Sequence, residues 1–188
     1  MLVILVSVMS IVWMASEVIL GLFSRTRRDS AVVRDRGSLV LLWTAIVAGL
    51  AVGNVIRFRG LGSMGAPQAP LLCAALVAIV CGLALRWTAI LTLGRLFTTT
   101  VAVSPGQRIV RTGVYRHVRH PAYTGLLLAL LGFGLALQNW LSLLAVVIPV
   151  AAALWYRMRV EEKVLVDILG REYVTYCGVT KRLIPGVY

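Results

Sequence analysis

The sequence has few of the side chains that build metal sites and disulfide frameworks. It contains three cysteines, none in a Cys-x-x-Cys pair, and two histidines. Cys73 and Cys81 fall inside an apolar run, where cysteine behaves as a small hydrophobic residue. We therefore expect neither a metal site nor a set of disulfides.

Acidic residues are also scarce. Seven Asp and Glu stand against nineteen Lys and Arg, which gives a formal net charge of +12. In a soluble protein this excess would suggest a nucleic-acid partner, but no nucleic-acid recognition module accompanies it. The basic residues gather between apolar runs instead, as they do in the cytoplasmic loops of membrane proteins. We expect membrane lipids as the surroundings and no nucleic acid as a partner.

What the sequence has in abundance is apolar residues. They make up 60% of its 188 positions, and the mean hydropathy is +0.90, whereas soluble domains are nearer half apolar. Five apolar runs are separated by polar segments: Leu2 to Phe23, Leu39 to Ile56, Leu71 to Leu93, Pro121 to Leu137 and Trp140 to Tyr156. The pattern predicts an all-α, multi-pass membrane helical bundle with about five transmembrane helices.

Three details of these runs need interpretation. The first run is interrupted by Glu17 and has no basic segment before it and no clear cleavage site, so we expect a retained helix rather than a signal peptide. Arg86 and Trp87 interrupt the third run, and Arg86 is expected to snorkel to the membrane interface. The last two runs are short, which favours a helical hairpin or a tilted pair.

The distribution of Lys and Arg predicts the orientation. The first connection, the segment Gly94–His120 and the tail from Arg157 to Tyr188 are basic, and the other two connections are not. With five spans this places the N-terminus outside and the C-terminus in the cytoplasm. Residues 1–93 would then form N-terminal transmembrane helices, and residues 94–188 a functional region with a helical hairpin and a cytoplasmic tail.

Two polar constellations on the basic side are candidates for function. In Arg119-His120-Pro121-Ala122-Tyr123, His120 precedes a proline at the expected first position of a helix, where free backbone N–H groups suit an anion. An ordinary interfacial helix cap is equally compatible with this pattern. Arg157 and Glu161 are four residues apart, so on a helix they share one face, as a functional pair or as a solvated ion pair.

Farther along, Tyr173 and Tyr176 either line a pocket or pack against the bundle. The order and spacing of these segments, together with three others, resemble the isoprenylcysteine carboxyl methyltransferase family over roughly Gly94 to Pro185, about half of the chain. The other segments are Gly94-Arg95-Leu96-Phe97-Thr98, Gln107 to Tyr115, and the tail with Glu161-Glu162, Gly170-Arg171-Glu172-Tyr173 and Arg182-Leu183-Ile184-Pro185.

The resemblance implies an S-adenosylmethionine-dependent methyltransferase whose cofactor pocket is formed by the Gly94–His120 loop and the tail. Carried over by position, the cofactor contacts fall on Gln107, Ile109, Tyr115, His120, Ala122, Tyr123 and Glu161. Gln107 stands where the family often has histidine, and Thr100 where some members have glutamine, so Thr100 is left out. Arg157 matches an arginine near the acceptor group, which makes Arg157 and Glu161 the expected catalytic residues, with Arg157 also binding substrate.

The acceptor is less determined than the donor. A carboxylate of an isoprenylcysteine-like, prenylated or other lipophilic substrate would need no general base, because it is already ionised at neutral pH. The arginine-rich and alanine-rich composition suggests a GC-rich bacterium and its plasma membrane, so a phospholipid amine, an alkyl-phenol or a polyketide lipid stays open. A non-catalytic membrane scaffold is the third alternative. The sequence does not indicate an oligomeric state.

Overall fold

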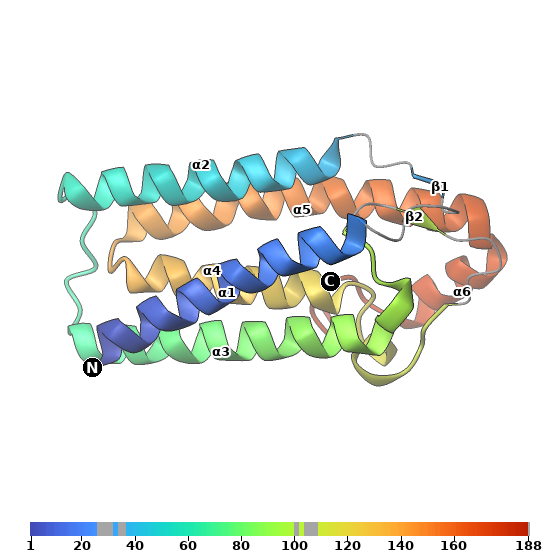
Figure 1. The fold of residues 1–188 in the computed structure, drawn as a ribbon, viewed down its shortest axis with the longest axis horizontal. Helices are drawn as coiled ribbons and strands as arrows, with labels where there is room; N and C mark the ends of the chain where they lie inside the picture. Colours follow the sequence, from blue (N-terminus) through green and yellow to red (C-terminus); the bar gives the residue numbers. More distant parts are fainter. Residues whose placement is uncertain (26–31, 34–36, 100–101, 104–108, 188) are drawn as a thin grey trace.

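The computed structural model describes residues 1–25, 32–33, 37–99, 102–103 and 109–187. Figure 1 shows long helices running side by side. The helices are α1 (Leu2–Arg25), α2 (Ser38–Phe58), α3 (Gln68–Leu93), α4 (Pro121–Ala136), α5 (Trp140–Leu169) and α6 (Arg171–Val179). Two short 3-10 helices, η1 (Gly94–Leu96) and η2 (Gly113–Arg116), and two antiparallel two-residue strands, β1 (Val32–Val33) and β2 (Ala102–Val103), complete the described elements.

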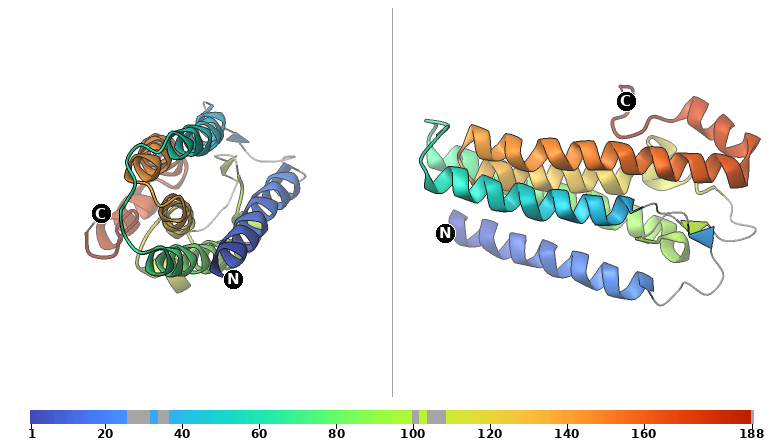
Figure 2. Two further views of the ribbon diagram at one scale, coloured as in Figure 1. Left: turned by 90° about the vertical axis from the view of Figure 1, so that its left-hand side faces the viewer. Right: turned by 90° about the horizontal axis from the view of Figure 1, so that it is seen from above.

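The predicted fold class is confirmed. Within the described residues, α1, α2, α3 and α5 are long and apolar enough to cross a membrane, and α4 is a shorter apolar helix of 16 residues. Neighbouring helices pack in the order α1, α3, α4, α5, α2, which gives the open curve seen along the bundle axis in Figure 2.

The connections divide the bundle into two ends. The α3–α4 connection and the chain after α5 lie at the same end as the last turn of α1 and the first turn of α2 (Figure 1). We call this the basic end. Of the nineteen Lys and Arg, only Arg57 and Arg59 lie next to the connections of the opposite end. The two longest polar segments of the sequence therefore share one end of the bundle.

The two charges that interrupt the apolar runs meet each other inside the bundle. The Arg86 guanidinium on α3 lies against the Glu17 carboxylate on α1, with Nε–Oε1 at 2.5 Å and Nη2–Oε2 at 2.7 Å. Both side chains are buried, at 7% and 6% exposure. The snorkelling predicted for Arg86 is wrong: pairing inside the bundle satisfies the guanidinium, so both helices continue through these positions.

α5 is much longer than the predicted run that ended at Tyr156. Its 30 residues span about 45 Å at 1.5 Å per residue, against about 30 Å of bilayer hydrocarbon. The helix therefore extends beyond the apolar layer, and Arg157, Glu161 and Glu162 lie on it rather than on a separate tail.

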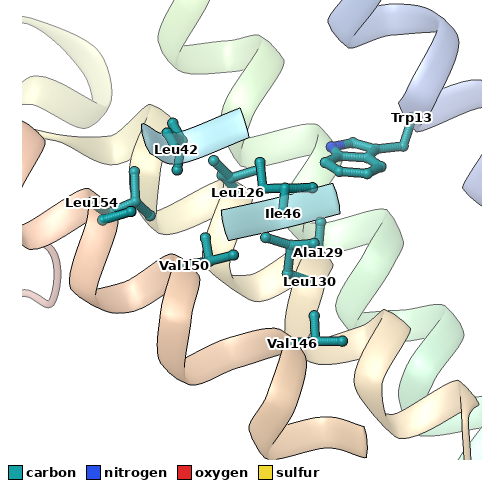
Figure 3. Close-up of a cluster of buried hydrophobic side chains, with 10 residues drawn as sticks. Trp13, Leu42, Ile46, Leu126, Ala129, Leu130, Val146, Val150 and Leu154 are labelled. Atoms are coloured by element: carbon teal, nitrogen blue, oxygen red, sulfur yellow. The ribbon is translucent and has the colours of Figure 1, made fainter. Parts of the chain in front are cut away.

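The core lies between α1, α2, α4 and α5. Figure 3 shows Trp13 of α1 beside Ile46 of α2 and Leu126 of α4. Trp13 closes the space between the two ends of the helix row, because its side chain is fully buried among these residues. Cys73 and Cys81 are exposed on the outer surface of α3, where a small apolar side chain suits lipid.

At one crossing the backbones of α3 and α4 touch. A Cβ on Gly125 would lie 2.6 Å from the Gly82 carbonyl oxygen and 2.7 Å from the Arg86 nitrogen. Glycine at this crossing allows the close approach that small residues give to membrane helices. It also places Arg86 directly beside the first turns of α4.

Candidate active site

The start of α4 and the C-terminal segment are joined by direct hydrogen bonds at the basic end. The Arg119 backbone N–H donates to the Lys181 carbonyl at 2.8 Å, and that of His120 to the Arg182 carbonyl at 3.0 Å. One turn into α4, Thr124 Oγ1 donates to the Leu183 carbonyl at 2.8 Å. The two halves of the motif series, about sixty residues apart in sequence, therefore form one unit.

Glu162 is the centre of an ion cluster within this unit. Its carboxylate receives hydrogen bonds from Arg119 Nε at 3.2 Å and Arg182 Nη2 at 2.7 Å. His120 Nε2 lies 3.2 Å from the same carboxylate. Sequence reasoning gave Glu162 no role, although the Glu161-Glu162 pair and Arg182 both lie in the motif. The cluster ties α5 to the start of α4 and to the tail.

Arg157, Tyr123 and Glu161 form a second chain of contacts. Arg157 Nε donates to the Tyr123 hydroxyl at 2.9 Å, and that hydroxyl donates to Glu161 Oε2 at 2.8 Å. The other Arg157 nitrogens reach outward: Nη1 donates to Ser38 Oγ at 3.0 Å and Nη2 to the Thr99 carbonyl at 2.5 Å. The Tyr123 hydroxyl thus links the arginine to the carboxylate.

His120 joins the two networks. Its Nδ1 lies 3.7 Å from Glu161 Oε2, and its ring stacks on that of Tyr123 with centroids 5.4 Å apart and an interplanar angle of 16°. His120 occupies the N-cap position of α4 and Pro121 the first helical position, as the sequence predicts, but the His120 side chain makes no capping bond. The imidazole contacts Glu161 and Glu162 instead.

These findings can be set beside known proteins. The model of the isoprenylcysteine carboxyl methyltransferase family matches residues 74–167, half of the chain. The chain belongs to this family.

Relatives carry names of the same kind. Protein-S-isoprenylcysteine O-methyltransferase B of Arabidopsis thaliana is 37% identical over 114 residues, which cover 60% of this chain and 58% of the relative. Protein-S-isoprenylcysteine O-methyltransferase of Saccharomyces cerevisiae is 40% identical over 68 residues, or 36% of this chain and 28% of the relative. The uncharacterized protein YpbQ of Bacillus subtilis is 32% identical over 80 residues, or 43% and 48%. The matched part of this chain spans little more than half of the Arabidopsis relative.

Two further residues of the predicted cofactor set, Tyr115 and Ala122, lie next to the cluster in an apolar patch. Both pack against Ala89 of α3. The Tyr115 carbonyl accepts a hydrogen bond from the buried Tyr176 hydroxyl at 2.6 Å. Tyr176 and Tyr173 are both buried. Of the two alternatives for these tyrosines, packing against the bundle describes Tyr176, because its hydroxyl bonds to the backbone.

The phenols behind the site stay protonated near neutral pH. Burial raises the pKa of Tyr115, with the negative charge of Glu161 adding to the effect. Burial likewise raises the pKa of Tyr176 to about 12. Neither tyrosine is suited to act as a general base in this methyltransferase-family fold.

Ile109 and Gln107 are the remaining members of the predicted cofactor set. Ile109 is partly buried at the beginning of the described segment 109–187, and its role in a cofactor pocket stays a prediction. Gln107 and Thr100 lie outside the described residues. The structure thus brings together His120, Tyr123, Arg157 and Glu161, with Tyr115 and Ala122 adjoining them.

Proposed function

We propose that this protein transfers a methyl group from S-adenosylmethionine to a lipophilic acceptor, with the carboxylate of an isoprenylcysteine-like molecule as the leading acceptor class. The observation that carries the proposal is the Tyr123 hydroxyl, which connects Arg157 on one side to Glu161 on the other. These are the residues to which family membership assigns the acceptor and the donor.

The residues present fit the methyl donor. Glu161 keeps 29% of its side chain exposed, whereas Glu162 keeps 12% and is covered by cations. An accessible carboxylate and the aromatic rings of His120 and Tyr123 suit a group with a sulfonium and an ammonium. When bound, S-adenosylmethionine supplies both the methyl group and its leaving group. The protein then has to align the reactants and exclude water.

The acceptor role falls to Arg157. Its two terminal nitrogens form the fork that binds a carboxylate through two parallel bonds. In the structure they hold Ser38 Oγ and the Thr99 carbonyl, so an acceptor carboxylate would replace these two oxygens. Ser38 begins α2, so this exchange would take place at the basic end of the bundle.

The membrane supplies the setting. We propose that the basic end faces the cytoplasm, because almost all Lys and Arg lie there. A lipophilic acceptor dissolved in the bilayer would then present its polar head at the level of Arg157. A carboxylate head is already ionised, which agrees with a site whose tyrosines stay neutral.

Two alternatives remain distinguishable by experiment. A phospholipid amine or an alkyl-phenol would use the same donor site with another acceptor, and a non-catalytic scaffold would use neither. Calorimetric titration of the purified protein with S-adenosylmethionine tests the donor: saturable binding is expected, and its absence would favour the scaffold.

A second assay identifies the acceptor. Transfer of a labelled methyl group is measured to a farnesylcysteine analogue and, in parallel, to lipid extracts. We expect the farnesylcysteine analogue to be methylated. Label incorporated only into the extracts would exclude the isoprenylcysteine assignment and favour the lipid alternatives.

A further inference from the structure

The chain after α6 turns back along the bundle toward the beginning of α4. Figure 1 shows α6 near the end of α5, whereas the last described residues lie beside the beginning of α4, level with the end of α1. The second view in Figure 2 agrees. The hydrogen bond from Thr124, on the first turn of α4, to the Leu183 carbonyl fixes this depth. The tail therefore reaches the level where the apolar helices begin.

Most carbonyl groups of this tail are hydrogen-bonded within the protein. Five consecutive carbonyls accept hydrogen bonds, each from a donor within the protein. They belong to Thr180, Lys181, Arg182, Leu183 and Ile184, and the donors are Arg119 Nη1, Arg119 N, His120 N, Thr124 Oγ1 and Val187 N. A carbonyl that is already hydrogen-bonded within the protein loses less free energy when it leaves water.

Two apolar side chains of the same segment are exposed. Ile184 is 52% exposed and Val187 73%. Lys181, at the start of the segment, is exposed as well. Apolar side chains next to a basic one match the boundary between acyl chains and headgroups, which accepts both kinds.

We propose that residues 181–187 insert into the bilayer interface, so that lipid holds one wall of the active site. The segment that would enter the lipid is the segment whose carbonyls hold Arg119 and His120. Arg182 of the same segment pairs with Glu162. Loss of contact with lipid would weaken these hydrogen bonds and so reduce the order of the active site.

Depth can be measured directly in lipid nanodiscs. A polarity-sensitive fluorophore is attached to Ile184→Cys in protein whose Cys73, Cys81 and Cys177 are replaced by serine. Thr175→Cys, exposed on α6, is the matched position. The label at 184 should be quenched by brominated acyl chains and shielded from aqueous iodide, and the label at 175 should behave in the opposite way. Iodide quenching at 184 equal to that at 175 would overturn the insertion.

The link to the site is tested by a matched pair of substitutions. Ile184→Asp and Val174→Asp change side chains of similar exposure, 52% and 54%, the first in the segment after α6 and the second on α6. In nanodiscs Ile184→Asp should weaken S-adenosylmethionine binding roughly tenfold, as expected from loss of about one hydrogen-bonded support. Val174→Asp should stay within about twofold.

This second arm rests on the proposed function and the first does not. Equal donor affinities of the wild type and Ile184→Asp would overturn the link between lipid and site. If the wild type itself bound no donor, the proposed function would fail, and the quenching result would still decide the insertion.

Discussion

Arg86 on α3 holds two other helices at once. Its guanidinium donates two hydrogen bonds to the Glu17 carboxylate on α1 and a third, at 3.0 Å, to the Ala122 carbonyl in the first turn of α4. A charge buried among membrane helices is costly unless it is paired. The N-terminal helix, which carries no part of the motif series, is thereby tied to the turn that bears His120 and Tyr123.

Breaking this pair should destabilise the protein severely. Arg86→Leu leaves the Glu17 carboxylate buried without its partner, which costs about 3–5 kcal/mol in comparable buried pairs. Unfolding by denaturant in detergent measures the change. The double variant Glu17→Arg with Arg86→Glu should regain much of the stability. It should not regain the affinity for S-adenosylmethionine, because a carboxylate at position 86 cannot give a hydrogen bond to the Ala122 carbonyl. Wild-type stability of Arg86→Leu would contradict the pairing.

His120 and Arg157 should fail in different ways. His120→Ala removes the side chain that contacts Glu161 and Glu162, so we expect roughly tenfold weaker binding of S-adenosylmethionine by calorimetry. Arg157→Ala should chiefly raise the KM for the acceptor. Equal loss of donor affinity in both variants would remove the assigned division of roles.

Tyr123→Phe isolates a single hydroxyl. The ring remains, but Arg157 Nε and Glu161 lose their shared partner, and an unsatisfied buried donor costs about 1–3 kcal/mol. We expect a large fall in kcat/KM with the protein still folded. Tyr156→Phe, an exposed tyrosine on the same helix as Arg157, is the control. Similar kinetics of the two variants would show that the hydroxyl is dispensable.

The contact between α3 and α4 leaves no room for a methyl group. Gly125→Ala forces a Cβ against the Gly82 carbonyl and the Arg86 backbone, and such overpacking costs about 1–3 kcal/mol. Gly178→Ala on α6 meets nothing within 4 Å and should leave the melting temperature unchanged or slightly higher, because alanine favours a helix. Thermal melts in detergent compare the two, and equal melting temperatures would argue against the close crossing.

Ionisation of the Tyr176 hydroxyl should lower the stability of the folded protein at alkaline pH. Its pKa is raised by burial from 10.0 to about 12, so the folded state holds this proton more tightly than the unfolded chain. The stabilisation is complete below pH 10 and declines as the pH rises through about 12. Tyr176→Phe should be less stable by about 1 kcal/mol near neutrality, and the gap to the wild type should narrow above pH 10. A constant gap would exclude this titration.

The positions of the helices could be predicted because hydropathy is a local property. Four of the five apolar runs correspond to helices that differ from the prediction by only a few residues at each end. The extension of α5 to Leu169 was missed because Arg157 to Leu169 is rich in charge. The side of this segment that packs against the protein is defined by tertiary contacts, such as those of Glu162 with Arg119 and Arg182. The family match begins at residue 74, within α3, so a boundary after residue 93 stays a prediction.

The partners of charged residues could not be predicted. Glu17 and Arg86 are 69 residues apart, and each alone resembles an ordinary interruption of an apolar run. Tyr123 and Arg157, by contrast, were found through the motif series, although the hydrogen bond between them follows only from the packing of α4 against α5.

The uninterrupted course of α5 has a mechanical consequence. Arg157 and Glu161 belong to the same helix as the apolar stretch that follows Pro149, and the helix runs without a break from the lipid-embedded part into the polar part. If a thicker or thinner bilayer changes the tilt of this helix, both residues shift together, and the distance between them is conserved. Their position relative to the shorter α4 changes instead. A change in bilayer thickness would therefore alter the hydrogen bonds that Arg157 and Glu161 make with Tyr123.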